Sequence, residues 1–216
     1  MARECYGYGR WNAPFWFIGP EQGKGPREAE DNGKRLAAWN RMGQPEVCDC
    51  RCFHKEIEED SWHRAIPRLQ TTWKSLILLL MTFHGQSPNN DARRAYQRDQ
   101  WGRSHGETCV IELSGLAARN LSMPADHKSH CEHRIATIRE RLLGQDNPPA
   151  FVVMYGKSDH SNWEKIVGQA LEHDVPVMRD GTVFVSLLHP NTHGLTNQYW
   201  INWGQHLRKI VKTPSV

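Results

Sequence analysis

Short apolar runs, each closed by glycine or proline, divide this chain into a regular series of segments. These runs are residues 14–19 (PFWFIG), 108–115 (TCVIELSG), 150–156 (AFVVMYG) and 182–190 (TVFVSLLHP). They are apolar throughout rather than alternating, which is typical of strands in a sheet that helices cover on both faces. We therefore predict a buried strand at each run.

Between these strands lie segments whose apolar residues recur at helical spacing. The clearest is residues 61–85, which Ser61 can cap and in which Ile66, Trp73 and Leu76 share one broad apolar stripe. Further helices are predicted over residues 27–43, 90–101, 129–144, 161–173 and 197–212. The order strand, helix, strand, helix predicts an α/β protein, a three-layer α/β/α sandwich around a short, mainly parallel sheet.

One domain, residues 1–216, accounts for the whole length, with a cysteine-rich insertion around residues 44–60. The mean hydropathy is −0.68. The longest aliphatic run, residues 76–81, is far shorter than the ~18 residues of a membrane span. The N-terminus lacks the apolar core of a signal peptide, so we expect a cytoplasmic protein, and we expect it to be a monomer.

A net charge of +3 is compatible with phosphate contacts but does not by itself indicate nucleic-acid binding.

Six cysteines in a chain without an export signal indicate free thiols or metal ligands rather than disulfides. Cys48, Cys50 and Cys52 stand at alternate positions and are followed by His54, a set that favours a zinc or iron–sulfur site. Alternate residues of an extended strand lie about 6.6 Å apart, whereas the sulfur ligands of one tetrahedral ion lie under about 4 Å apart. The segment must therefore coil around an ion to bind it, and clustered free thiols are the alternative.

Residues able to do chemistry stand where the first and last predicted strands end. Glu21 lies in a loop rich in glycine and proline after the first strand, and His189 begins the polar loop after the last. Ligands of an open parallel sheet bind beyond the carboxyl ends of its strands, so we predict that these two side chains face one pocket. An acid and an imidazole there suit a reaction in which one handles a water molecule and the other meets a developing negative charge. Each also has a simpler interpretation, Glu21 as a helix cap and His189 as a hydrogen-bonded residue at a strand end.

These residues resemble the motifs of the uracil-DNA glycosylase superfamily, whose fold is a three-layer α/β/α sandwich. Its first motif, Gly-x-(Asp, Asn or Glu)-Pro-x after the first strand, is matched by residues 19–23 (GPEQG), with Gln22 in place of the usual proline. Its last motif, similar to His-Pro-Ser-Pro, is matched in placement and in its first two residues by residues 189–195 (HPNTHGL). Residues 152–156 (VVMYG) fit the family's glycine after the third strand. The resemblance covers the order of elements over nearly the whole chain.

The resemblance implies a DNA glycosylase that hydrolyses the N-glycosidic bond of a base flipped out of DNA and leaves an abasic site. Glu21 then activates water and stabilises the oxocarbenium-like sugar, while His189 donates to the leaving base, and no cofactor is required. The base pocket is expected to include Gly19, Pro20, Gln22, Gly23, Glu112, Ser114 and Asn120. DNA contacts are expected from Lys24, Lys157, Ser158, Asn191, Thr192, His193 and Leu195. Leu195, or alternatively His193, is expected to be the intercalating wedge. The aromatic candidates for base stacking are Tyr6, Tyr8, Trp11, Phe53 and Trp163.

Departures from the family pattern bear on the substrate. Strict uracil enzymes carry a tyrosine after the proline of the first motif, where it blocks substituents at pyrimidine C5, and Gly23 stands there in this chain. The asparagine that often ends the second strand and pairs with the base is also missing, and Glu112, Ser114 or Asn120 can replace it. We therefore predict a pyrimidine substituted at C5. Removal of hypermodified bases, such as glycosylated hydroxymethylcytosine, from phage DNA as an antiviral defence is the hypothesis for its biological role.

Two other functions stay open from the sequence. A nucleoside or nucleotide N-glycosidase would use the same bond chemistry. A nucleic-acid-binding module without turnover would follow if Gln22 displaces Glu21 from the sugar. Only the DNA glycosylase generates alkali-labile abasic sites in DNA.

Overall fold

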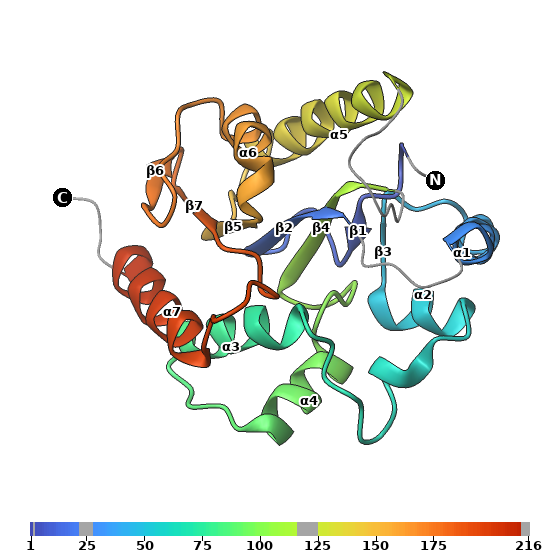
Figure 1. The fold of residues 1–216 in the computed structure, drawn as a ribbon, viewed down its shortest axis with the longest axis horizontal. Helices are drawn as coiled ribbons and strands as arrows, with labels where there is room; N and C mark the ends of the chain where they lie inside the picture. Colours follow the sequence, from blue (N-terminus) through green and yellow to red (C-terminus); the bar gives the residue numbers. More distant parts are fainter. Residues whose placement is uncertain (2, 22–27, 116–124, 213–216) are drawn as a thin grey trace.

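The computed structural model describes residues 1, 3–21, 28–115 and 125–212, without the side chains of residues 21, 28–29, 125–130 and 212. In this part of the chain, a seven-stranded mixed sheet has the order β3-β1-β4-β2-β5-β7-β6 (Figure 1). The strands are β1 (Gly7–Tyr8), β2 (Phe15–Glu21), β3 (Val47–Cys48), β4 (Thr108–Ser114), β5 (Phe151–Tyr155), β6 (Val177–Arg179) and β7 (Thr182–Leu187).

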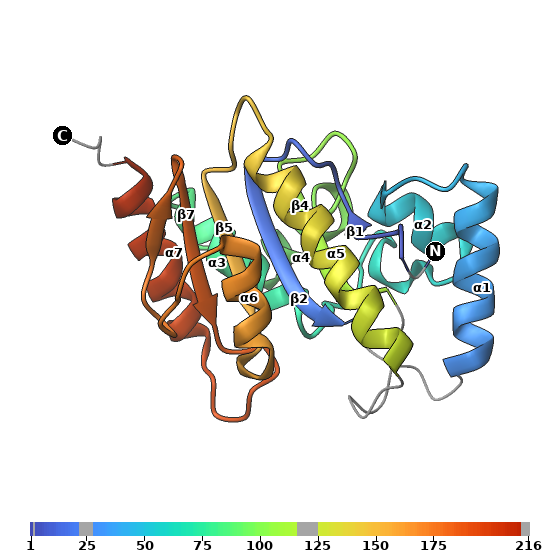
Figure 2. The ribbon, with the colours of Figure 1, turned by 90° about the horizontal axis from the view of Figure 1, so that it is seen from above.

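Helices cover both faces of this sheet, which confirms the predicted α/β/α fold. Helices α5 and α6 lie on one face, and α3, α4 and α7 lie on the other, while α1 and α2 flank the edge formed by β3 and β1 (Figures 1 and 2). The helices are α1 (Glu28–Arg41), α2 (Cys50–Glu56), α3 (Trp73–Phe83), α4 (Asn90–Asp99), α5 (Ala125–Leu143), α6 (His160–Val167) and α7 (Asn197–Lys212). Two 3-10 turns are η1 (Asp60–Trp62) and η2 (Lys157–Asp159). No helix of the described residues is long and apolar enough to cross a membrane.

The four strands predicted from the sequence form the parallel centre of the sheet, in the order β4, β2, β5, β7. The remaining strands were not predicted, because each has only two or three residues and carries no apolar run of its own. Of these, β1 pairs antiparallel with β4 and β6 pairs antiparallel with β7, so the sheet is mixed at both sides. The cysteine-rich segment is likewise part of the fold, because it supplies β3 and α2.

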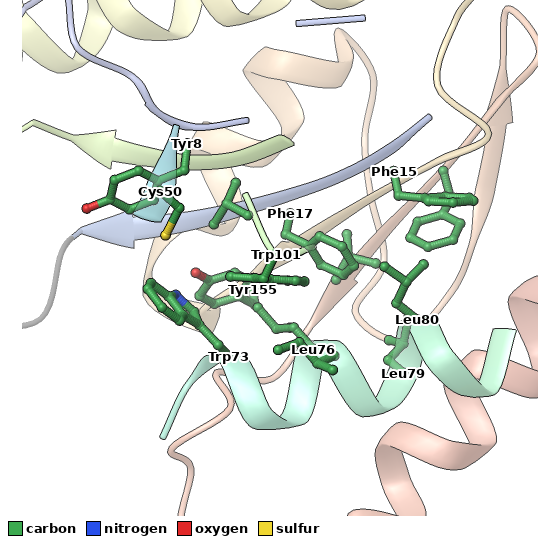
Figure 3. Packing of buried hydrophobic residues seen from close by; sticks show 14 of the residues in the cluster. Tyr8, Phe15, Phe17, Cys50, Trp73, Leu76, Leu79, Leu80, Trp101 and Tyr155 are labelled. Atoms are coloured by element: carbon green, nitrogen blue, oxygen red, sulfur yellow. The ribbon is translucent and has the colours of Figure 1, made fainter. Parts of the chain in front are cut away.

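Side chains of the central strands alternate between two separate hydrophobic cores. Phe15 and Phe17 of β2 belong to the core beneath α3 and α7, whereas Trp16 and Ile18 belong to the core beneath α5 and α6. Figure 3 shows the first of these cores, with strand residues packed onto Leu76 and neighbouring residues of α3. A period of two residues along each strand thus divides one apolar run between both faces.

Two predicted helices are shorter than their apolar pattern. The segment predicted as one helix over residues 61–85 is helical only in η1 and α3, and Ile66 is 82% exposed. Pro67 explains the interruption, because it lacks an N–H and disfavours helical backbone at the preceding residue. The helix predicted over residues 161–173 ends at Val167, where Gly168 adopts left-handed backbone (φ 78°) and closes it.

Candidate functional site

The carboxyl ends of β4, β2, β5 and β7 lie side by side along one edge of the sheet. Glu21 at the end of β2 pairs with Ser114 of β4, and Tyr155 at the end of β5 pairs with Leu187 of β7. The strand that carries Glu21 and the strand that leads into His189 are therefore separated by β5 alone. Parallel strands bring their carboxyl ends to one edge, which is where α/β proteins bind ligands.

Gly19 lies directly against the ring of Tyr155. A Cβ atom at residue 19 would stand 2.3 Å from Tyr155 Oη and 2.4 Å from its Cζ, so no side chain larger than hydrogen fits there. The next residue, Pro20, lies 3.5 Å from the position that a Cβ atom on Gly156 would occupy. The glycine and proline of the first motif thus fix the end of β2 against the end of β5.

Tyr155 also contacts His189, the predicted catalytic imidazole. Their ring centroids are 5.5 Å apart in an edge-to-face arrangement. The backbone N–H of Asn191 donates a hydrogen bond to His189 Nδ1 (3.1 Å), and the Asn191 side chain donates to Thr72 Oγ1 (3.3 Å) just before α3. Burial lowers the pKa of His189, so the neutral ring predominates at neutral pH. Because Nδ1 accepts a hydrogen bond, the single proton of that neutral ring must sit on Nε2, which is therefore a donor.

The backbone before His189 is anchored by Tyr199 of α7. The N–H of Leu188 donates to Tyr199 Oη (3.3 Å), and that hydroxyl donates to Asp174 Oδ1 (2.5 Å). Burial raises the pKa of Tyr199, and the hydrogen bond to Asp174 raises it further, so the phenol stays protonated. The histidine loop is thus held at both ends, by Thr72 on one side and by Tyr199 on the other.

A buried polar group stands at the end of β4, on the other side of β2. Glu112 and Ser114 are both buried, and Glu112 is the strand partner of Gly19. Burial raises the pKa of the Tyr155 hydroxyl, and the negative charge of Glu112 raises it further. Glu112 and Ser114, two of the residues predicted for the base pocket, therefore lie on the strand next to Gly19 and Glu21.

Arg134 of α5 holds this end of β4 in place. Its guanidinium is completely buried and donates to the carbonyls of Leu113 (2.9 Å), Glu112 (2.6 Å) and Cys5 (2.8 Å). Burial lowers the pKa of Arg134, and the nearby Tyr6 partly offsets that shift.

Several predicted site residues lie outside the described part of the chain or differ from expectation. Gln22, Gly23, Lys24 and Asn120 fall outside the described residues, as does the side chain of Glu21. The expectation that Glu21 lies in a loop is corrected, because its backbone is the last residue of β2. Gly19 forms no strand end, since pairing with β4 continues past it.

The predicted DNA-contacting residues after β5 and β7 are mostly at the surface. Lys157, Ser158, Asn191, Thr192 and His193 are exposed. The Ser158 hydroxyl donates to Asp159 Oδ2 (2.8 Å), while Leu195 is partly buried against the core beneath α3. Of the two wedge candidates, His193 is the exposed one.

The aromatic residues proposed for base stacking are mainly core residues. Tyr6, Tyr8, Phe53 and Trp163 are buried, and Trp11 packs between other rings and donates to Glu46 Oε2 (2.8 Å). Packing in the core therefore accounts for these residues.

No protein-family model and no curated protein matches the chain.

The cysteine-rich segment forms a second polar cluster, remote in sequence from the first. Cys50, His54 and His63 are buried, and one ligand atom of each lies within 4.8 Å of the others, so this group can bind a metal. Burial lowers the pKa of His54 to about 3 and that of His63 to about 4.

The predicted metal-binding set of Cys48, Cys50, Cys52 and His54 is corrected by this cluster. Cys52 is exposed, and the Cys48 sulfur lies 3.9 Å from Cys5 Sγ. His63, which was not predicted, joins Cys50 and His54 instead.

Four residues of these clusters were missed by sequence reasoning. Tyr155 and Tyr199 were hidden inside apolar patterns that predicted only packing. Arg134 carried a signal, because it lies one turn before the buried Ile138 on the apolar face of its helix. No sequence signal marked His63 as a possible metal ligand, since it lay in a segment predicted to be one continuous helix.

Proposed function

We propose that this protein is a DNA glycosylase that hydrolyses the N-glycosidic bond of a pyrimidine flipped out of DNA. The proposed substrate is substituted at C5 or hypermodified, with glycosylated hydroxymethylcytosine of phage DNA as the leading example. The products are a free base and an abasic site. Bond cleavage uses side chains alone and requires no cofactor.

The observation that carries this proposal is the hydrogen bond that His189 Nδ1 accepts from the Asn191 N–H (3.1 Å). Cleavage of an N-glycosidic bond leaves electrons on the base, so a hydrogen-bond donor at a base oxygen stabilises the departing anion. A neutral imidazole whose Nδ1 is occupied by the Asn191 N–H presents an Nε2–H donor and no acceptor to a ligand. This arrangement favours stabilisation of an anion over abstraction of a proton, because a ring already protonated on Nε2 has no free lone pair there.

The backbone position of Glu21 supports the second half of the reaction. Glu21 is the last residue of β2, at the carboxyl edge of the sheet. Only β5 separates β2 from β7, the strand that leads into His189. In the proposed mechanism its carboxylate lies beneath the sugar and stabilises the oxocarbenium-like centre. It also accepts a proton from water as the water oxygen bonds to C1′, and the base anion is later protonated by solvent.

The substrate class is supported by groups on either side of Gly19. Buried Glu112 and Ser114 can pair with the polar edge of a base. A base read in this way must leave the duplex first, which costs a few kcal/mol that the exposed loop residues offset. Asn191, Thr192 and His193 are exposed on the loop directly after His189.

The test is an alkali-cleavage assay on matched oligonucleotides. Duplex and single-stranded DNA carrying cytosine, uracil, 5-hydroxymethylcytosine or its glucosylated form are incubated with the protein, heated in alkali and examined for scission. We expect scission at the modified base only. Glu21→Gln and His189→Asn should each lower the rate about 10²-fold or more while leaving DNA binding intact. His206→Asn, an exposed histidine of α7, is the matched control and should retain full activity.

The rival functions predict different results. If the protein releases bases from free nucleosides but causes scission of no DNA, it is a nucleoside N-glycosidase and not a DNA glycosylase. If the wild type binds DNA but releases no base, and Glu21→Gln binds DNA equally well, the protein is a nucleic-acid-binding module and not a glycosylase.

A further inference from the structure

We propose that Cys50, His54 and His63 bind one Zn²⁺ ion, through Sγ, Nδ1 and Nε2 respectively, as a structural site that anchors the cysteine-rich segment. This site is separate from the glycosylase chemistry.

The distances among the three atoms match those of ligands around a single zinc ion. Cys50 Sγ lies 3.5 Å from His54 Nδ1 and 3.8 Å from His63 Nε2, and the two nitrogens are 3.2 Å apart. Tetrahedral Zn–S bonds of about 2.3 Å and Zn–N bonds of about 2.0 Å put sulfur and nitrogen about 3.5 Å apart and two nitrogens about 3.3 Å apart. The protein alone therefore holds all three donors at zinc-ligand spacing.

Local structure accounts for this convergence. Asp49 caps α2 by accepting from the Cys52 N–H (3.0 Å), and it is fixed by the Arg103 Nε–H (2.9 Å). The cap turns the chain from β3 into a helix, where Cys50 and His54 are four residues apart and share one face. His63 reaches the same face because its N–H closes η1 on the Asp60 carbonyl (2.8 Å). The segment thus coils as an ion requires, through a helix and a turn rather than a strand.

The surroundings are those of a structural site. Cys50 is 0% exposed, His54 3% and His63 5%. Aromatic rings surround them: the His54 ring is 5.3 Å from that of Tyr8 and 5.6 Å from that of Trp73. Figure 3 shows Cys50 at the end of the core that also holds Tyr8 and Trp73. An ion in this position is shielded from substrates.

The donor set favours zinc over the metal ions that prefer oxygen ligands or need more thiolates. One thiolate and two imidazoles suit Zn²⁺, a set that copper also accepts, whereas Mg²⁺ and Ca²⁺ prefer oxygen ligands and iron–sulfur clusters need four protein ligands, at least two of them thiolates. The three protein ligands leave the fourth tetrahedral position to a water molecule, and the burial of all three ligands, rather than a closed set of four protein ligands, makes the site structural. On binding, the Cys50 thiol releases one proton to solvent. The His54 proton, now donated from Nδ1 to the Cys50 carbonyl (2.7 Å), moves to Nε2.

The experiment measures metal directly in the full chain. We expect elemental analysis of the purified protein to find about one zinc per chain. Replacement by Co²⁺ should give the visible bands of tetrahedral cobalt together with a thiolate charge-transfer band. Cys50→Ser and His63→Asn should lower the bound zinc at least tenfold. A chelator should lower the thermal unfolding midpoint of the wild type.

Two cysteines of the same segment provide matched controls. Cys52→Ser, on the same helix but exposed, and Cys48→Ser, beside Cys5, should keep the zinc and the charge-transfer band. These controls together with the wild-type cobalt spectrum decide the question even if Cys50→Ser does not fold. Wild-type protein that takes up neither Zn²⁺ nor Co²⁺ would overturn the proposal, as would loss of the charge-transfer band in Cys52→Ser or Cys48→Ser. Copper or iron in place of zinc would overturn the identity of the ion.

Discussion

The ring of Tyr155 fills the space that any side chain at residue 19 would need, so Gly19 and Tyr155 are matched across two neighbouring strands. A Cβ atom on Gly19 would stand 2.3 Å from Tyr155 Oη, and the tyrosine is only 2% exposed. The tyrosine cannot move away without disturbing its edge-to-face contact with His189, 5.5 Å from ring to ring. Gly19 and His189 are thereby coupled through one buried ring.

We predict that Gly19→Ala is destabilising by about 1–3 kcal/mol and also lowers activity, because the methyl group forces Tyr155 against its neighbours. Thermal and urea unfolding measure the first effect, and the abasic-site assay measures the second. Gly33→Ala is the control: this glycine of α1 has nothing within 4 Å of its added Cβ, and alanine should stabilise the helix by about 0.5–1 kcal/mol. If Gly19→Ala costs as much in a Tyr155→Ala background as in the wild type, the two residues are not coupled.

The protonation of His189 should be visible in its pH dependence. Burial places the pKa of this histidine below its usual value of about 6.5, so the folded state binds fewer protons than the unfolded chain just below that pH. The contribution of the neutral ring to the free energy of unfolding and to catalysis is therefore fully present above about pH 6.5. It declines as the pH falls through the lowered pKa. The acid limb of kcat/KM should therefore have its midpoint below about 6.5.

The tautomer of His189 can be checked independently of catalysis. Nitrogen-15 chemical shifts of the neutral ring should show a bare Nδ1 and a protonated Nε2, because Nδ1 accepts from the Asn191 N–H (3.1 Å). A proton found on Nδ1 at neutral pH would refute the role given to His189 as an Nε2 donor.

Tyr199→Phe should impair activity more than stability. Removing the hydroxyl leaves the Leu188 N–H without its acceptor and frees the chain just before His189. We expect a loss of about 1 kcal/mol in unfolding free energy and a several-fold fall in kcat. Asp174→Asn is the matched control, because its amide oxygen still accepts from the Tyr199 hydroxyl and Leu188 keeps its acceptor. Equal losses of activity in both variants would argue against positioning through Leu188.

Arg134→Ala should be among the most destabilising substitutions in the protein. It leaves the carbonyls of Leu113, Glu112 and Cys5 without a buried charged donor, which we expect to cost about 3 kcal/mol or more in unfolding free energy. Arg139→Ala on the same helix removes one partly exposed hydrogen bond to the Lys165 carbonyl (3.0 Å) and should cost about 1 kcal/mol or less. A small effect of Arg134→Ala, measured by urea unfolding, would contradict the anchoring role.

Apolar patterning alone determined the centre of this fold. The runs that became β2, β4, β5 and β7 are apolar on both faces, and burial on both faces leaves a parallel sheet between helices as the stable arrangement. The order of elements also determined that Glu21 and the His189 loop come to one sheet edge, because parallel strands end on the same side. Local patterns failed where one residue overruled them, as Pro67 and Gly168 did for the two helices.

Only the tertiary structure decided which side chains meet. Gly19 and Tyr155, or Arg134 and the end of β4, are far apart in sequence, and no local periodicity records their contact. The same is true of His63, which joins Cys50 and His54 from the end of η1, in a segment whose apolar pattern predicted a helix. Patterning determines which face of an element is buried, whereas the packing of elements against one another decides what each buried group touches.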